Sequence, residues 1–139
     1  MAKKILCAMD DSEHSKSAVA FAAELAKATG AELTILAVNT PVGGAGRGGI
    51  VVYAWEDADL QRVLDQATAE AKKAGASSLK TAGVKSRDPG RAIVIYAEEN
   101  GIDHIVVGTG GKGGMARLML GSVSSDVIAR AHCPVTVAR

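Results

Sequence analysis

The sequence has few of the residues that mark several large protein classes. Its 139 residues include one Trp, two Tyr and one Phe, and its two cysteines, Cys7 and Cys133, stand far apart. A core must therefore be built from Ala, Val, Ile and Leu, and neither a disulfide framework nor a zinc cluster is indicated. No apolar run approaches the ~18 residues of a membrane span, and the run after the first lysines is too short for a signal peptide. We expect a cytoplasmic protein with no membrane contact.

An excess of one charge is also missing. Sixteen Lys and Arg oppose fifteen Asp and Glu, which gives a formal net charge of +1. Proteins that bind nucleic acids in general carry a basic patch or a basic excess, so this balance predicts no nucleic-acid partner. Apolar residues make up 47% of the chain, which is enough to bury a core. The length is typical of a single domain, and we expect one over residues 1–139.

Two patterns alternate along the chain. Short apolar runs predict strands at 3–9, 32–38, 78–84, 103–108 and 134–138. Apolar residues at helical spacing predict four helices. The first lies between Asp10-Asp11-Ser12 and Gly30, and the others run over 60–74, from 88 to 100 and from Ser122 or Ser124 to 131. This alternation predicts an α/β fold, a five-stranded parallel sheet with helices on both faces. The residues alone leave two common strand orders open, 3-2-1-4-5 and 2-1-3-4-5.

A glycine-rich stretch, GTGGKGGMARLMLGSV, follows the predicted fourth strand at residues 108–123. Ligands of such sheets bind at the carboxyl ends of the strands, which is where these glycines lie. A glycine loop lets backbone amides approach an anion without hindrance from Cβ atoms. Gly121 and Ser122 precede the last helix, whose amino end favours a second anion. Two anion sites joined by nine residues suit a chain of phosphates.

Two known phosphate motifs do not account for this stretch. The P-loop pattern fails because Val106 replaces its first glycine and Gly113 replaces its Ser or Thr. The pattern G-x-G-x-x-G matches at Gly108, Gly110 and Gly113, but too little chain follows for the second half of a dinucleotide fold. We therefore exclude NAD as the ligand.

A third spacing fits better. Gly108-x-x-Gly111, nine residues and then Gly121-Ser122 resemble the nucleotide signature of the universal stress protein family. KKILCAMDDSEHSKSAVAFAAELA resembles the family's first strand, terminal aspartate and first helix, and YAEENGIDHIVVGTGGKGG and LMLGSVSSDVIARAHCPVTVAR resemble its closing third. The resemblance implies strand order 3-2-1-4-5 in a Rossmann-like fold related to the adenine nucleotide alpha hydrolases. Asp10 and Gly108 would then face each other across one cleft.

The resemblance also implies a ligand. Members with this signature bind ATP, or ADP or AMP, some with Mg²⁺ or Mn²⁺, and act as regulators in the stress response. Asp10 would lie beside the adenine and ribose, and the backbone of Val38 would meet the adenine edge. The residues implied as nucleotide contacts are Asp10, Val38, Val107, Gly108, Thr109, Gly111, Lys112, Arg117, Gly121, Ser122, Val123 and Ser124. For Lys112 and Arg117 the residues leave phosphate contact and solvent exposure equally open.

A homodimer is expected on two grounds. Residues 134–138 form the last strand, which would be an edge with unpaired backbone groups under the implied order. The family commonly pairs that strand with the same strand of a second copy.

Other interpretations stand beside this one. Ser122 and Ser124 could be simple helix caps. The glycine-rich segment 41–55 is either a flexible surface loop or a lid whose Arg47 reaches the phosphates. Gly110 stands where the family often has histidine, so a possible side-chain contact to the ligand is missing there. No catalytic triad and no zinc-protease motif occurs, so we expect no catalytic residues and no assigned metal ligand. A slow ATPase or phosphotransferase and a scaffold without nucleotide remain the alternative functions.

Overall fold

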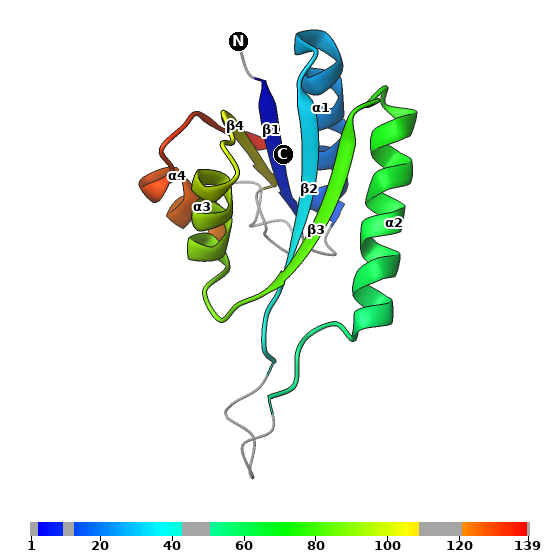
Figure 1. Ribbon diagram of the computed structural model, residues 1–139. Helices are drawn as coiled ribbons and strands as arrows, with labels where there is room; N and C mark the ends of the chain where they lie inside the picture. Colours follow the sequence, from blue (N-terminus) through cyan, green and yellow to red (C-terminus); the bar gives the residue numbers. More distant parts are fainter. Residues whose placement is uncertain (1–2, 10–12, 43–50, 109–120, 139) are drawn as a thin grey trace.

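A computed structural model describes residues 3–9, 13–42, 51–108 and 121–138 (Figure 1). Its strands are β1 (Lys4–Met9), β2 (Glu32–Asn39), β3 (Leu79–Lys85), β4 (His104–Gly108) and β5 (Val135–Ala138). Its helices are α1 (Glu13–Thr29), α2 (Asp57–Lys73), α3 (Pro89–Glu99) and α4 (Ser122–Arg130). All strand pairs of the sheet are parallel, which confirms the predicted α/β architecture.

The strand order is β3-β2-β1-β4-β5, as the family resemblance implied. β1 lies at the centre, where Cys7 is opposite Ile35 of β2 on one side and Val106 of β4 on the other. From β1 the chain first winds outward to β2 and β3, and it then returns to the other side of β1 to form β4 and β5. The winding direction therefore reverses between β1 and β4, and ligands of open parallel sheets bind at such a point.

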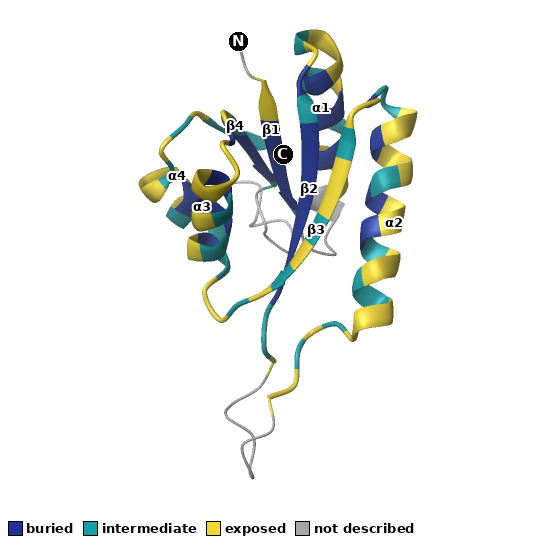
Figure 2. Cartoon of the chain, in the orientation of Figure 1, coloured by how far each residue is buried: buried dark blue, intermediate teal, exposed yellow. Residues whose placement is uncertain are grey.

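Helices cover both faces of the sheet, and alternate strand residues face opposite layers. Ile5 and Cys7 of β1 pack with α1 and α2, whereas Leu6 and Ala8 pack with α3 and α4. The central strands are accordingly buried along most of their length, and the helices are exposed on their outer sides (Figure 2). No helix in the described part of the chain has the length and apolar character that crossing a membrane requires.

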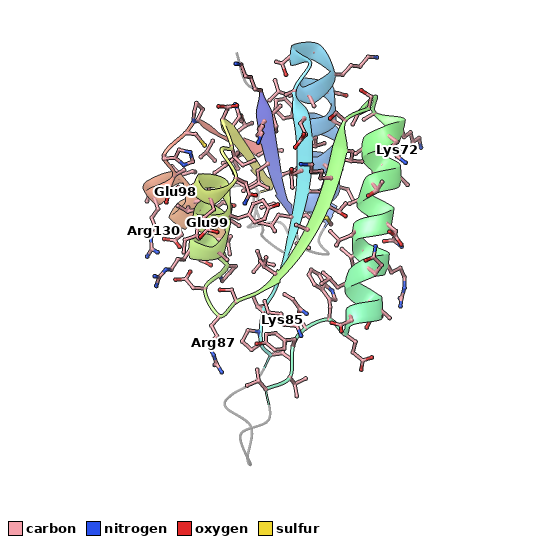
Figure 3. The ribbon with its side chains drawn as sticks, viewed as in Figure 1. Lys72, Lys85, Arg87, Glu98, Glu99 and Arg130 are labelled. Carbon is pink, nitrogen blue, oxygen red and sulfur yellow. The ribbon has the colours of Figure 1, made fainter. Side chains whose placement is uncertain are left out.

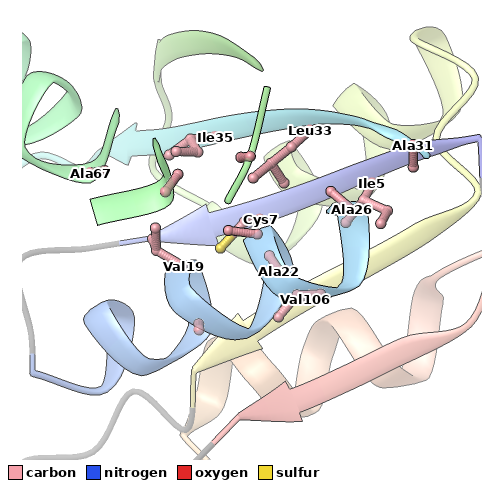
Figure 4. Packing of buried hydrophobic residues seen from close by; sticks show 14 of the residues in the cluster. Ile5, Cys7, Val19, Ala22, Ala26, Ala31, Leu33, Ile35, Ala67 and Val106 are labelled. Carbon is pink, nitrogen blue, oxygen red and sulfur yellow. The ribbon is translucent and has the colours of Figure 1, made fainter. Parts of the chain in front are cut away.

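The layer between α1 and the sheet is built from small side chains. The buried α1 residues are Ala18, Val19, Ala22, Ala23 and Ala26 (Figure 4). They pack on larger strand residues such as Leu33 and Ile35, both fully buried. Each such Leu or Ile stabilises the fold by about 1.5–3 kcal/mol relative to an exposed position. Alanine on the helix and branched residues on the strands thus form a core that needs few aromatic rings.

Glycines with a positive φ follow α1, α2 and α3. Gly30 after α1 has φ 72° and Gly101 after α3 has φ 65°, backbone conformations that residues with a Cβ atom rarely adopt. The predicted helix ends at these two residues are confirmed.

A short antiparallel hairpin stem extends beyond β2 at the carboxyl edge of the sheet (Figure 1). The backbone N–H of Val42 donates to the carbonyl oxygen of Val52 at 2.8 Å. At the base, the fully buried side chain of Asn39 donates to the Trp55 carbonyl at 2.7 Å and accepts from the Trp55 N–H at 3.0 Å. This pairing of the ends of segment 41–55 was not predicted. Residues 43–50, with the lid prediction for Arg47, lie outside the described residues.

Candidate functional site

A cleft of about 220 Å³ opens at the carboxyl edge of the sheet, where β1 and β4 lie side by side. Strands β1, β2 and β4 provide one part of its lining, and the first turns of α3 and α4 provide the rest. The lining residues are Ala8, Met9, Val38, Thr40, Pro89, Ile93, Val107, Gly108, Gly121, Ser122, Val123 and Ser124. The cleft thus lies at the point where the winding of the sheet reverses.

One wall of the cleft is apolar and rigid. Val38 of β2, Ile93 of α3 and Val107 of β4 line it, and each is at most 9% exposed. All three belong to the core between the sheet and α3 and α4, so their positions are fixed by packing. Small-molecule sites are typically lined by such apolar side chains, with a few polar groups that set orientation. This wall suits a flat, weakly polar ring.

The amino end of α4 provides the polar side of the cleft. The residue before the helix is Gly121, which has φ −66° and ψ 161° and has no side chain to cap the helix. The first backbone bond of the helix runs from the Ser125 N–H to the Gly121 carbonyl at 3.0 Å. The N–H groups of Ser122, Val123 and Ser124 precede that bond and therefore have no acceptor within the helix. Together with the positive end of the helix dipole, they favour an anion in the cleft.

A side-chain hydrogen bond fixes this helix end to the sheet. The hydroxyl of Ser124, which is only 2% exposed, donates to the carbonyl oxygen of Gly108 at 2.5 Å. Gly108 is the last residue of β4, so the bond holds the first turn of α4 against the end of that strand. The Ser124 hydroxyl proton is used within the chain, whereas Ser122 is exposed at the cleft.

Helix α3 begins beside the same cleft but is closed to anions. Its N-cap is Asp88, whose carboxylate accepts a hydrogen bond from the Arg91 N–H at 3.2 Å. The second carboxylate oxygen lies 4.0 Å from the guanidinium of Arg130 on α4. A negative charge at this helix end would repel a phosphate. Of the two helix ends at the cleft, only that of α4 is therefore open to an anion.

The described lining of the cleft holds no titratable side chain, because it consists of Ala, Met, Val, Thr, Pro, Ile, Gly and Ser. Among the described residues there is also no group of three His, Cys, Asp or Glu side chains that could hold a metal ion. Asp88, which lies beside the cleft, is used as a helix cap. These groups can bind and orient a ligand, but they offer neither a general base nor a nucleophile with a lowered pKa.

Seven of the twelve predicted contact residues line the cleft together. They are Val38, Val107, Gly108, Gly121, Ser122, Val123 and Ser124. The other five, Asp10, Thr109, Gly111, Lys112 and Arg117, lie outside the described residues. The contact roles themselves stay predictions.

Thr40, directly after β2, also lines the cleft, as the rule on the carboxyl ends of strands predicts. Sequence reasoning missed Ala8, Met9, Pro89 and Ile93. Ala8 and Met9 stand at the carboxyl end of β1, a signal that could have found them. Ile93 gives no such signal, because its place depends on how α3 packs on the sheet.

Comparisons with known proteins agree with this geometry. The sequence model of the universal stress protein family matches residues 1–139. The universal stress protein YxiE of Bacillus subtilis is 34% identical over 154 residues, with 100% of both chains covered. The crystal structure of a universal stress protein in complex with cAMP has a TM-score of 0.77 at 28% identity, covering 99% of this chain and 97% of the other. A universal stress protein of Archaeoglobus fulgidus in complex with dAMP has a TM-score of 0.72 at 27% identity, covering 99% and 98%.

Proposed function

The chain belongs to the universal stress protein family, and on that premise we propose that its cleft binds an adenine nucleotide and that the protein acts as a nucleotide-dependent regulator in a stress response. One observation carries the proposal. The apolar wall formed by Val38, Ile93 and Val107 faces the same cleft as the uncapped amino end of α4. A nucleotide has the matching parts, a flat base at one end and an anion at the other. The relatives solved with cAMP and dAMP hold ligands of this class.

The cleft suggests how the nucleotide lies. The base packs against Val38 and Ile93, and the backbone at Val38 reads its edge. The phosphate nearest the ribose accepts hydrogen bonds from the N–H groups of Ser122 and Val123, and the Ser122 hydroxyl is a further donor. Ser124 acts on the ligand indirectly, because its hydroxyl holds α4 in place.

ATP is the nucleotide that we propose. Its outer phosphates require donors beyond the end of α4, and Gly111, Lys112 and Arg117 are the candidates that the family signature supplies. Asp10 belongs beside the ribose, since it directly follows Met9, which lines the cleft. A Mg²⁺ or Mn²⁺ ion would travel with the phosphates of ATP, as in other nucleotide sites where substrate oxygens provide most of the ligands.

Thermal unfolding with a nucleotide panel tests the proposal. Ligand at a hundred times its Kd stabilises a protein by about 2.7 kcal/mol, which raises the Tm by several degrees for a chain of this size. We expect this rise with ATP, ADP, AMP or cAMP. Adenosine, which lacks the phosphate, and GTP, which has the same phosphates on another base, serve as matched controls. If no adenine nucleotide shifts the Tm, and none is released from the purified protein on heating, the proposal is wrong.

We also propose that β5 pairs with its twin in a homodimer. The Ile105 N–H bonds to the Pro134 carbonyl at 3.0 Å, so even-numbered residues of β5 pair with β4. In a parallel ladder the N–H groups of Val135 and Val137 then point to the open edge of the sheet. Val137→Pro removes one of these donors without breaking a bond to β4, and proline is tolerated at such positions. Sedimentation should show a dimer for the wild type and a monomer for this variant, and a monomeric wild type would refute the pairing.

A further inference from the structure

A second hollow lies beside α3 and shares no lining residue with the cleft. It has a volume of about 550 Å³ and runs between α3 and the end of β3, the edge strand of the sheet. Val84, Ala92 and Ile95 contribute an apolar floor, and Lys85, Arg87 and Arg91 contribute charge at its rim. We refer to it as the β3–α3 groove. Lys85 and Arg87 are visible at the end of β3 in Figure 3, on the side of the molecule from which the hairpin stem extends.

The cations of this groove lack acidic partners within the described part of the chain. Lys80, on the same strand, pairs with Glu32 at 3.2 Å, and Arg130 pairs with Asp126 at 2.9 Å. In contrast, no described carboxylate lies within ion-pair distance of Lys85, Arg87 or Arg91. Lys85 instead lies over the ring of Tyr53, 5.0 Å from its centre. In a protein with a net charge of +1, three such side chains around one hollow form a local positive patch.

Two carboxylates, Asp88 and Glu99, also line the groove and offset part of this charge, so that the three cations leave an excess of one positive charge. Asp88 is used as the cap of α3 and faces Arg130. Glu99 is the last residue of α3, about two helical turns beyond Arg91. The charge is therefore positive at the end of the groove next to the carboxyl edge of the sheet.

The edge of β3 next to the groove is open. The Ser86 N–H donates to the Asn39 carbonyl at 3.0 Å, so even-numbered residues of β3 pair with β2. By the alternation of a parallel ladder, the N–H and carbonyl groups of Thr81, Gly83 and Lys85 point outward. An unpaired edge of this kind accepts an added strand.

From these features we propose that the β3–α3 groove binds an acidic, extended peptide segment of another protein, which adds a strand to β3. Main-chain bonds to Gly83 and Lys85 would align the segment. Because side chains alternate along a strand, every second residue of the segment would project over the apolar floor at Val84 and Ile95. Carboxylates at the end of the segment next to the turn would meet Arg87 and Arg91.

A small anion fits the groove less well. Lys85, Arg87 and Arg91 are exposed at the rim and do not converge on a buried point. The floor is apolar, with Val84 and Ala92 half-buried and Ile95 38% exposed. An occupant must therefore bring apolar groups as well as negative charge, which a peptide does and a phosphate does not.

Fluorescence anisotropy with a labelled octapeptide in which glutamate alternates with valine tests the proposal. The matched probe replaces each valine with serine, which keeps the charge and removes the apolar groups. We expect the Glu–Val peptide to bind, with an affinity that falls as salt is raised. The double variant Arg87→Glu, Arg91→Glu should weaken binding by about tenfold or more, because two attractions become repulsions. Ile95→Ser should also weaken it.

The control variant is Lys72→Glu, Lys73→Glu, which makes the same change of net charge on the last turn of α2 (Figure 3). It should bind the peptide as the wild type does, and thermal unfolding shows whether each variant is folded. Equal loss in the control, equal binding of the Glu–Ser probe, or no binding to the wild type would each overturn the proposal.

Hydrogen exchange measured by NMR should show protection of the Thr81, Gly83 and Lys85 amides in the complex. Unchanged exchange with peptide bound would overturn the strand pairing.

The outcome is separate from that of the nucleotide experiment. The groove and the cleft share no lining residue, and they use different residues of α3. Peptide binding is measured by anisotropy and nucleotide binding by the shift in Tm, so either proposal can fail while the other stands.

Discussion

The Ser124 hydroxyl and the Gly108 carbonyl oxygen join two parts of the chain that are sixteen residues apart. Their hydrogen bond is part-buried, with Ser124 2% exposed, and it connects the first turn of α4 to the last residue of β4. It thus sets the distance between the helix end that faces an anion and the strand that supports the apolar wall. This relationship gives the neighbouring serines Ser122 and Ser124 different roles.

Ser124→Ala should destabilise the protein, and Ser122→Ala should not. The first change removes the donor to the half-buried Gly108 carbonyl, which costs about 0.5–1.5 kcal/mol. The second removes an exposed hydroxyl, and such changes usually stay within about 0.5 kcal/mol. Both should weaken nucleotide binding, Ser122→Ala by loss of a direct donor. Urea unfolding and nucleotide titration of the two variants measure this, and equal stability would contradict the role assigned to Ser124.

Gly121→Asp should affect stability and nucleotide binding in opposite directions. An aspartate N-cap stabilises a helix by a few tenths of a kcal/mol relative to glycine, and the φ and ψ angles of Gly121 suit any residue. Its negative charge would repel phosphate, as Asp88 does at α3. Gly121→Asn is the matched control, since it caps as well without charge. We expect an equal or higher Tm for both variants, but a large loss of ATP affinity only for aspartate. Unaltered affinity in Gly121→Asp would show that the phosphate lies elsewhere.

Gly83→Ala should destabilise the protein because of one neighbour. A Cβ atom at this position would lie 2.7 Å from the Cδ2 atom of Leu60 on α2. Overpacking of this kind costs roughly 1–3 kcal/mol, toward the lower end here because Leu60 can turn. In a Leu60→Ala background the same change should become neutral or stabilising, since glycine weakens a strand. A double-mutant cycle in urea checks this, and equal effects in both backgrounds would refute the contact.

The two cysteines should differ in reactivity. Burial raises the pKa of the Cys7 thiol to about 12, and the side chain is fully enclosed between α1 and the sheet (Figure 4). Cys133 is half-buried, and desolvation and nearby Asp103 raise the pKa of its thiol as well. A thiol reagent at mildly alkaline pH should therefore modify one cysteine in the native protein and two in guanidinium. Cys133→Ser should abolish the native reaction. Reaction of Cys7 in the folded protein would contradict the packing.

Acid should destabilise the fold through His104. Burial lowers the pKa of this histidine below 6.5, and its Nε2 atom lies 2.7 Å from the Thr136 hydroxyl. The unfolded chain binds the proton more tightly than the folded protein does. The neutral His104 side chain therefore stabilises the fold fully above about pH 6.5, and this stabilisation is lost as the pH falls through the pKa of the folded state. Urea unfolding between about pH 7 and 5 should show a falling free energy of unfolding, with a smaller fall in His104→Asn. The same slope in both proteins would contradict this.

Asp103 acts in a different and more acidic range. Hydrogen bonds from the N–H groups of Lys3 and Lys4 lower the pKa of its carboxyl below 3.8. Its contribution is lost only as pH falls below that value, so it does not obscure the titration of His104.

Much of the fold could be predicted from the sequence, because its local signals agree. Gly30 and Gly101 end helices where the apolar spacing ends, and Asp88-Pro89 begins α3 as expected. The strand order required more than local signals, since two orders satisfy the same pattern, and the family signature decided between them. The hairpin stem was missed because glycines dominate segment 41–55. Its pairing depends on the buried amide of Asn39, which no local pattern indicates.

The site divides in the same way. The strand ends and Gly121-Ser122 were predictable, since strand carboxyl ends and helix amino ends follow from element boundaries. Ile93 was not, because its position depends on the packing of α3. The hydrogen bond of Ser124 was not predicted either, since a serine near a helix start is equally consistent with a cap, a ligand contact or a tie to a neighbouring strand.

The clamp between Asn39 and Trp55 has a mechanical consequence. Asn39 directly follows Val38, whose backbone we assign to the base of the nucleotide, and both polar atoms of its amide hold the foot of the hairpin stem. The stem and the end of β2 are therefore coupled through two hydrogen bonds of one buried side chain. A shift of the stem residues Val42 and Val52 would therefore be passed to the carboxyl end of β2, next to the residue that we assign to the base.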